Sequence, residues 1–233
     1  GMANGIVNAG GSMGQFLMAP IAGALLVGVG WANAMQLLAL CVLLALPAAF
    51  LLKGNARHLA PVGLPVVGTR EAIRTALRDD RYRLLGAGFF VCGFHVAFLA
   101  THLPGVIAAC GLPVAFGAWS LAMIGLFNVV GSLAMGWAVG RWRMKSLLSL
   151  VYATRAVAVL LFLLAPKTGA VVLVFAAVMG LTFLSTVPPT VGLVVKFFGL
   201  SNMATLFGIV MFSHQIGGFL GAWLGGQIFV ATG

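Results

Sequence analysis

The stretch GIVNAGGSMGQFLMAPIAGALL at residues 5–26 recurs in altered form as GIVMFSHQIGGFLGAWLGGQIF at residues 208–229. An ungapped alignment gives identical residues at the pairs Gly5/Gly208, Ile6/Ile209, Val7/Val210, Gly14/Gly217, Phe16/Phe219, Leu17/Leu220, Ala19/Ala222 and Gly23/Gly226. Both stretches are apolar, rich in glycine and about long enough to cross a bilayer as a helix. A repeat with so wide a spacing predicts that the repeating unit is a whole bundle of helices. The alternative is convergence, because small residues are favoured in all membrane helices.

The composition excludes a soluble domain. The chain of 233 residues is 62% hydrophobic and only 7% charged, with a mean hydropathy of +1.14. Thirteen basic and three acidic residues give a net charge of +10. The basic residues stand mostly between apolar runs, as the positive-inside rule requires, and do not form one polar face. We therefore expect a membrane protein with no nucleic-acid partner.

The cysteines Cys41, Cys92 and Cys110 lie inside or beside apolar runs and show no CxxC spacing. Neither a disulfide framework nor a metal site is indicated, and no cofactor is expected. The N-terminus has no charged region or cleavage site typical of a signal peptide. Apolar segments begin and end almost at the chain ends, which predicts a fragment of a longer protein.

Seven segments are apolar enough and long enough to span a membrane, since about 20 residues are needed. They cover residues 5–29, 32–52, 84–103, 113–139, 146–165, 170–195 and 203–230. Only helices can satisfy their backbone groups alone in lipid. The predicted fold class is an all-α, polytopic membrane helix bundle.

The distribution of basic residues predicts the orientation of the spans. The loop after the second span holds seven of them: Lys53, Arg57, Arg70, Arg74, Arg78, Arg81 and Arg83. With alternating spans, Arg141, Arg143, Lys145 and Lys196 fall on the same side and only Lys167 on the other. Residue 1 and the loop 53–83 are therefore predicted to be cytoplasmic.

Within that loop, Arg70, Arg74 and Arg78 line one helical face, while Ile73, Ala76 and Leu77 form another. This pattern predicts a short amphipathic helix on the inner leaflet, in contact with the lipid bilayer.

The first and seventh spans have the same predicted orientation, as a parallel repeat with a six-helix unit requires. The intact protein would then have twelve helices in two bundles. Residues 1–52 would be the last two helices of the N-terminal bundle, and residues 53–83 the loop between bundles. Residues 84–233 would be the first five helices of the C-terminal bundle.

This layout resembles the major facilitator superfamily. The segment that best carries the resemblance is GWAVGRWRMK, residues 136–145. It is similar to the family's cytoplasmic loop pattern, glycine-x-x-x-aspartate-arginine-x-glycine-arginine-arginine. Gly136, Arg141 and Lys145 match in type, whereas Gly140 replaces the aspartate and Arg143 the second glycine.

Four shorter stretches resemble the bacterial branch of monocarboxylate-transporter-like and oxalate/formate-antiporter-like permeases. They are NGIVNAGGSMGQ (4–15), YATR (152–155), STVPPTVG (185–192) and HQIGGFLGAWLGG (214–226). The resemblance implies a secondary transporter of the bacterial inner membrane, in which two bundles rock about a central substrate site.

Arg155 is predicted to lie near mid-bilayer, about 14 Å along its helix from Ser146. An ionisable residue at this depth is a functional candidate because burying it is unfavourable. Arginine does not lose its charge, so Arg155 must face a partner, water or an anion, and Tyr152 shares its face. Substrate binding and a structural tie to a carbonyl or neighbouring helix both stay open.

Histidines are the other titratable candidates. His95 and His102 share a face of the third span, and His214 with Gln215 lies mid-span on the last. A histidine there can donate to a carboxylate and titrate near neutral pH, which permits a coupling proton. The simpler alternative is a hydrogen bond between helices.

Uncharged polar residues complete the candidate cavity, with helix-to-helix hydrogen bonding as the alternative role. They are Asn8, Ser12, Gln15, Asn128, Thr182 and Ser185. Pro188 and Pro189 are expected to interrupt the sixth span, because proline frees a carbonyl. Glycines in small-xxx-small spacing predict close helix packing or sliding between bundles. They are Gly10, Gly14, Gly136, Gly140, Gly217, Gly221 and Gly225.

No Asp or Glu occurs in any predicted span, whereas Arg155, His95 and His214 do. This charge balance favours a small organic anion, a mono- or dicarboxylate, as the substrate. An efflux permease for amphipathic compounds on the same fold is the alternative. A seven-helix receptor is less consistent with the repeat. An enzyme is not expected, because the sequence contains no catalytic motif.

Overall fold

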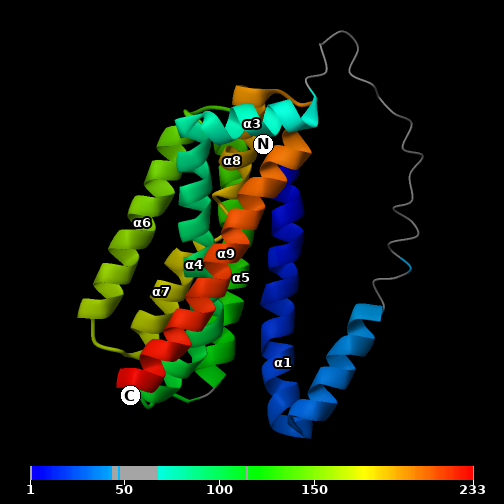
Figure 1. The fold of residues 1–233 in the computed structure, drawn as a ribbon. Helices are drawn as coiled ribbons and strands as arrows, with labels where there is room; N and C mark the ends of the chain where they lie inside the picture. Colours follow the sequence, from blue (N-terminus) through cyan, green and yellow to red (C-terminus); the bar gives the residue numbers. More distant parts are fainter. Residues whose placement is uncertain (1, 44–46, 48–67, 114, 233) are drawn as a thin grey trace.

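The computed structural model describes residues 2–43, 47, 68–113 and 115–232, and these residues form helices joined by short turns, without strands. Figure 1 shows the arrangement. The helices are α1 (Met2–Leu43), α3 (Thr69–Arg78), α4 (Asp80–Ala109), α5 (Ala115–Ala138), α6 (Met144–Leu164), α7 (Gly169–Thr182), α8 (Val187–Phe198) and α9 (Met203–Thr232). The predicted all-α class is therefore confirmed.

The helix α1 folds back on itself at Gly30, where the backbone has φ 76° and ψ 167°. Only glycine adopts such a conformation readily, because it has no Cβ. Figure 1 shows the two arms of α1 on either side of this bend. The bend lies at the predicted joint between the first and second spans. The remainder of the second span, residues 44–46 and 48–52, lies outside the described residues.

Six helices in the described part are long and apolar enough to cross a membrane. The longest, Gly5–Leu43, contains the bend at Gly30 and so includes the first predicted span and the start of the second. The segment Gly169–Phe198 matches the sixth predicted span. It is divided by a break at residues 183–186, between α7 and α8.

The short helix α3 crosses one end of the bundle (Figure 1). Its Ala72 and Ala76 are buried, and Ala76 belongs to a cluster with Tyr82 of α4 and Leu206 of α9. Leu77 is 49% exposed. The predicted amphipathic helix thus exists, but part of its apolar face packs on the bundle.

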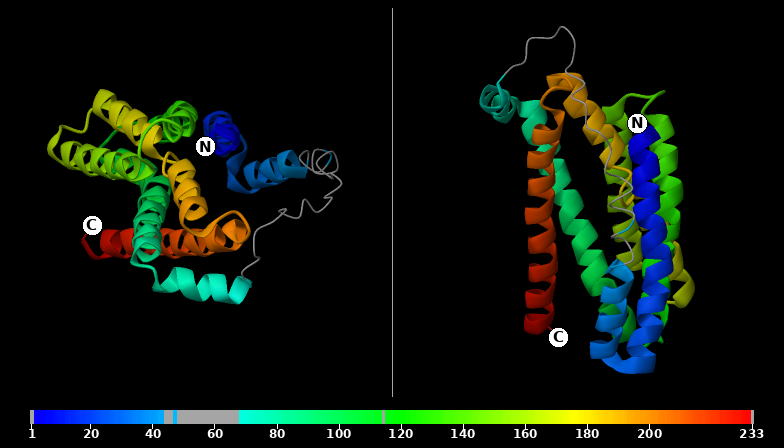
Figure 2. Two further views of the ribbon diagram at one scale, coloured as in Figure 1. Left: turned by 90° about the horizontal axis from the view of Figure 1, so that it is seen from above. Right: turned by 90° about the vertical axis from the view of Figure 1, so that its right-hand side faces the viewer.

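Three pairings hold the long helices together: α4 with α9, α1 with α5, and α5 with α7. The views in Figure 2 agree that α1 lies along α5, with α4 and α9 side by side beyond α8. The helices α4 and α9 run in the same direction (Figure 1). This arrangement leaves α6 at the periphery, against α7 and α8.

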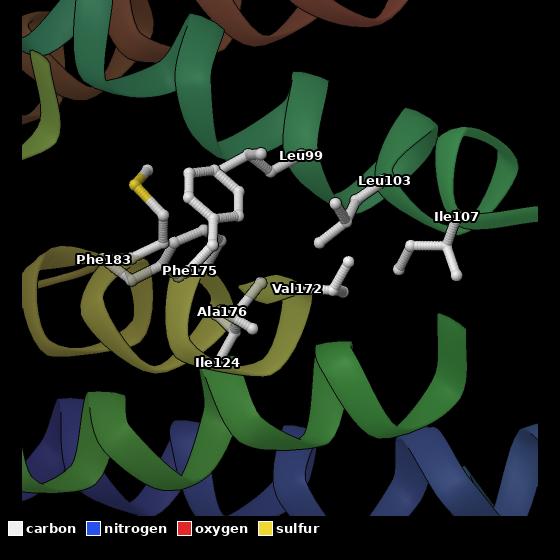
Figure 3. Packing of buried hydrophobic residues seen from close by; sticks show 9 residues of the cluster. Leu99, Leu103, Ile107, Ile124, Val172, Phe175, Ala176 and Phe183 are labelled. Atoms are coloured by element: carbon white, nitrogen blue, oxygen red, sulfur yellow. The ribbon is translucent and has the colours of Figure 1, made fainter. Parts of the chain in front are cut away.

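The largest described apolar cluster fills the space between α4, α5 and α7, as Figure 3 shows. It consists of Leu99, Leu103, Ile107, Ile124, Val172, Phe175, Ala176, Met179 and Phe183. Because Phe183 lies in the break after α7, this core also fixes the position of that break.

Candidate functional site

The break between α7 and α8 interrupts a membrane-spanning segment and frees backbone groups in an apolar region. Residues 183–186 are not helical, so the last carbonyls of α7 lack partners within the helix. Pro188 and Pro189 lie in the first turn of α8. Proline is tolerated there, because the first amide groups of a helix have no helical acceptor. The interruption therefore falls just before the two prolines.

Arg155 of α6 supplies partners for those carbonyls. Its side chain is 1% exposed. Nη2 donates to the Thr182 carbonyl and, at 2.6 Å, to the Phe183 carbonyl. Nε lies 3.4 Å from Thr182 Oγ1. A guanidinium at the C-terminal end of a helix also compensates the negative end of the helix dipole.

Arg155 thus forms the structural tie that was one of its two predicted roles. Its Nη1 is directed to the thiol of Cys92 on α4, at 3.3 Å, and Cys92 Sγ lies 3.3 Å from Thr186 Oγ1. These bonds link three helices at the break. Substrate binding by Arg155 stays a prediction. Tyr152, one turn earlier, donates to the Gly88 carbonyl at 2.7 Å.

Asn128 of α5 holds the break from another side. Its side chain is fully buried, and Oδ1 accepts a hydrogen bond from the Leu184 amide at 2.9 Å. Nδ2 donates to Ser12 Oγ on α1 at 2.8 Å. Asn128 therefore connects α1, α5 and the break, which is the interhelical role that was its alternative.

Ser185 donates to the Leu181 carbonyl at 2.6 Å, and Thr182 to that of Met179 at 3.0 Å. Gln15 bridges α1 and α5 through a 3.4 Å bond to the Leu121 carbonyl. Asn8 Nδ2 is buried and has no partner among the described residues.

Of the titratable side chains that the structure describes, His95 has an unused polar atom. Its Nδ1 is buried and has no hydrogen-bond partner among the described residues. The side chain lines a cavity of about 300 Å³ between α4, α6 and α7. The other lining side chains are apolar: Phe94, Phe98, Leu99, Leu103, Val106, Val159, Phe162, Leu163, Phe175 and Met179.

The other two described histidines have protein partners. His102 Nε2 donates to the Ala222 carbonyl of α9 at 2.9 Å. His214 Nδ1 lies 3.3 Å from Gln215 Oε1, and its ring centroid is 5.2 Å from that of Phe89. Although His95 and His102 share a helix face, their rings reach different elements. His214 is not among the side chains that line the cavity beside His95.

Glycines on α9 form notches that receive α4. A Cβ on Gly217 or Gly221 would overlap the carbonyl oxygen of Phe90 or Phe94, respectively. A Cβ on Gly225 would overlap the His102 ring. These three glycines stand where the two helices approach closely.

The other predicted glycines differ in their surroundings. Gly136 lies against α1, since a Cβ on Gly5 would be 3.3 Å from its Cα. Around Gly10 and Gly14, a Cβ would meet no described heavy atom within 4 Å. At Gly140 it would meet only Trp137 of the same segment. Among the described residues these last three therefore mark no close approach of helices, because spacing alone does not say which face has a neighbour.

Sequence reasoning missed three contributors to the site. Cys92 and Thr186 join the Arg155 contacts. Gly93 receives the His214 carbonyl where a Cβ would not fit. A lone cysteine and a lone glycine in apolar helices carry no spacing signal, because their partners are about 60 to 120 residues away in the chain.

Two comparisons with known proteins place this geometry in a family. A family model described as Major Facilitator Superfamily matches residues 1–222. The chain is 26% identical over 245 residues to the "Uncharacterized MFS-type transporter YcxA" of Bacillus subtilis (strain 168). That match includes 100% of this chain and 58% of the relative. The chain therefore spans little more than half the length of this relative.

Proposed function

Since this chain belongs to the major facilitator superfamily, whose members are membrane transporters and not enzymes, we propose that it is part of a secondary active transporter for a small organic anion. The cargo is a mono- or dicarboxylate, in line with the resemblance to monocarboxylate-transporter-like and oxalate/formate-antiporter-like permeases. The transporter resides in a bacterial plasma membrane with the loop 53–83 in the cytoplasm.

The charge balance of the described spans carries the proposal. Arg155, His95, His102 and His214 lie within them. The described acidic residues are Glu71, Asp79 and Asp80, at one end of the bundle. Ionisable residues within the membrane usually belong to the pathway of the transported solute. A pathway with basic but no acidic side chains suits an anion.

His95 is the proposed primary contact, because its Nδ1 is buried next to a cavity and has no hydrogen-bond partner in the described part of the chain. A protonated imidazole can donate a charge-assisted hydrogen bond to a carboxylate. His214 and Gln215 are the second proposed contact, and a proton on either histidine would couple transport to pH. Asn128 and Ser185, with Arg155, shape the break beside this pathway.

In the proposed mechanism, residues 1–52 and 84–233 belong to two bundles that rock about the site. The segment α7–α8 contributes the joint for this motion, since side-chain hydrogen bonds from Arg155 and Asn128 supplement the backbone ones at its break. Broken helices are a recurrent feature of secondary transporters.

Transport by the full-length protein in proteoliposomes tests this proposal, with a panel of labelled mono- and dicarboxylates. We expect His95→Ala to lower the initial rate at least tenfold, and His214→Ala to lower it less. His102→Ala is the matched control, because its ring already bonds to a backbone carbonyl of α9. No uptake of any carboxylate by well-folded wild-type protein would contradict the proposal.

An efflux permease for amphipathic compounds is the second candidate. The cavity beside His95 favours it, because four phenylalanines, Phe94, Phe98, Phe162 and Phe175, line a space with a single polar side chain. Export of a lipophilic cation without carboxylate uptake would establish this function instead.

A further inference from the structure

A groove with four basic side chains lies at the end of the bundle that α3 crosses. It has a volume of about 530 Å³ and runs between the α5–α6 turn and the end of α8. Arg141 and Arg143 line it from the turn, Lys145 from the first turn of α6, and Lys196 from α8. Trp142 and Phe197 contribute aromatic walls.

These four cations have no carboxylate partner in the part of the chain that the structure describes. The described ion pairs lie elsewhere, between Asp79 and Arg81 at 2.6 Å and between Asp80 and Arg83 at 3.1 Å. Like charges around one groove raise its positive potential and attract anions. A ligand with clustered negative oxygens would therefore relieve their repulsion.

The backbone adds to the positive potential of the groove. The helix α6 begins at Met144, its first turn holds no acidic residue, and Arg143 at the cap position makes no capping hydrogen bond. The positive end of the helix dipole is thus uncompensated beside the four cations. Arg141 is held in place by stacking, with Cζ 4.3 Å from the ring centroid of Trp137.

The aromatic residues suggest what kind of anion enters. Trp137 and Trp142 are 44% and 55% exposed, and their ring centroids are 5.3 Å apart. Exposed tryptophans beside basic residues at a helix end are typical of the headgroup level of a membrane. From this level, apolar exposed side chains such as Leu150 of α6 continue along the bundle, where acyl chains would lie.

We propose that this groove binds the phosphate of an anionic phospholipid, with its acyl chains against the outside of the bundle. Arginine suits such a ligand, because its guanidinium donates two parallel hydrogen bonds to phosphate oxygens. The site is separate from the His95 cavity, and it requires membrane embedding but not transport of any particular solute.

Native mass spectrometry of the full-length protein tests the proposal, after delipidation and titration with phosphatidylglycerol or phosphatidylcholine. The test variant is Arg143→Gln with Lys196→Gln, which removes one cation from each wall. We expect each substitution to weaken phosphatidylglycerol binding about fivefold, as for basic residues near an anionic membrane surface. Phosphatidylcholine binding should not change.

The matched control is Arg83→Gln with Lys167→Gln, which removes the same charge from two side chains that do not line the groove and that already have protein partners. We expect it to bind phosphatidylglycerol like the wild type. An equal loss in the control would overturn the site, as would full retention by the groove variant or no binding by the wild type. Soluble glycerol phosphate should compete poorly, and competition as strong as that of the lipid would overturn the lipid assignment.

Discussion

The charged side chain of Arg155 donates hydrogen bonds to backbone carbonyls at the break after α7. Replacing it by leucine would leave the Thr182 and Phe183 carbonyls without donors in an apolar region, so we expect a loss of about 3 kcal/mol in the free energy of unfolding. Arg155→Lys should be intermediate, because one ammonium does not reproduce the planar donor set of a guanidinium. Thermal unfolding of the detergent-solubilised full-length protein measures both variants.

Lys167→Gln is the control for this prediction. Lys167 also donates to carbonyls at the end of α6, those of Leu163 at 3.2 Å and Ala165 at 2.7 Å, but its side chain is only partly buried. We expect its unfolding to match the wild type within about 0.5 kcal/mol. If Arg155→Lys were fully stable yet unable to transport, Arg155 would bind the substrate and not hold the break.

At the residue scale, the sequence predicts which side chains are unusual but not their partners. The depth of Arg155 follows from its distance along an apolar run. Its contacts with Thr182, Phe183 and Cys92 arise from the way three helices meet. The same holds for Asn128, whose acceptor atom serves an amide that is free only because the helix breaks there.

Asp79 stabilises the start of α4. Its carboxylate accepts the Arg81 amide at 2.8 Å and pairs with the Arg81 guanidinium. The hydrogen bond from the Arg81 side chain is the main reason that its pKa falls from 3.8 to about 2. Because the folded-state pKa is the lower one, this stabilisation is complete above the ordinary pKa and disappears as the pH falls through about 2.

Asp79→Ala should therefore melt at a lower temperature than the wild type by an amount that is constant from pH 8 to 5. The difference should shrink below pH 4 and vanish near pH 2. Melting curves across this range check the prediction, and a difference that varied between pH 8 and 5 would contradict it. Asp80→Ala is the control, since Asp80 pairs with Arg83 but caps no amide.

The helix pair α4–α9 depends on glycine at the contact. Gly217→Ala would force the Cβ against the Phe90 carbonyl, so we expect about 2 kcal/mol of destabilisation. Gly208→Ala on the same helix should be neutral or slightly stabilising, because a Cβ there meets no described atom within 4 Å and alanine favours helix. Thermal unfolding of the two variants would show equal effects if the notch were unimportant.

Among the elements, hydropathy predicts the long helices well because lipid requires each span to be apolar and helical. The chemistry of proline predicts that the helix is interrupted near Pro188. It does not predict that the interruption lies a few residues before that proline. Small-residue spacing predicts close contact equally for Gly217 and Gly10. Only the arrangement of the neighbouring helices shows that Gly217 lies at a close contact within the described structure and Gly10 does not.

For the molecule as a whole, the charge distribution predicts opposite sides for the two ends of the described bundle. Native Cys110 is exposed in the turn after α4, and Lys196 is exposed in the last turn of α8. As single cysteines, Cys110 should react with an impermeant thiol reagent from outside the cell. A cysteine in place of Lys196 should react only in inside-out vesicles. Reaction of both from one side would refute the predicted topology.

The two-bundle division of residues 1–52 and 84–233 follows from the repeat at residues 5–26 and 208–229. The first arm of α1, before the bend at Gly30, packs along α5. Most of the large apolar side chains of α1 are exposed. That packing is consistent with a division between bundles, but it does not fix one. Substrate identity is beyond sequence reasoning, because it depends on a few side chains that meet from distant helices.

Along α9, glycines recur every four residues at 217, 221 and 225, so each turn of this face resembles the next. Sliding α9 by one turn, about 6 Å, would set Gly221 opposite Phe90 and Gly225 opposite Phe94 without a clash at either. Glycine thus sets how near the helices lie but not which turns face each other. That alignment is defined by three hydrogen bonds. Tyr82 donates to the Leu206 carbonyl and Ser213 to the Gly86 carbonyl, each at 2.7 Å, and His102 donates to the Ala222 carbonyl at 2.9 Å. Without these three side-chain donors, the pair would have more than one well-packed alignment and would lose its unique structure while keeping both helices intact.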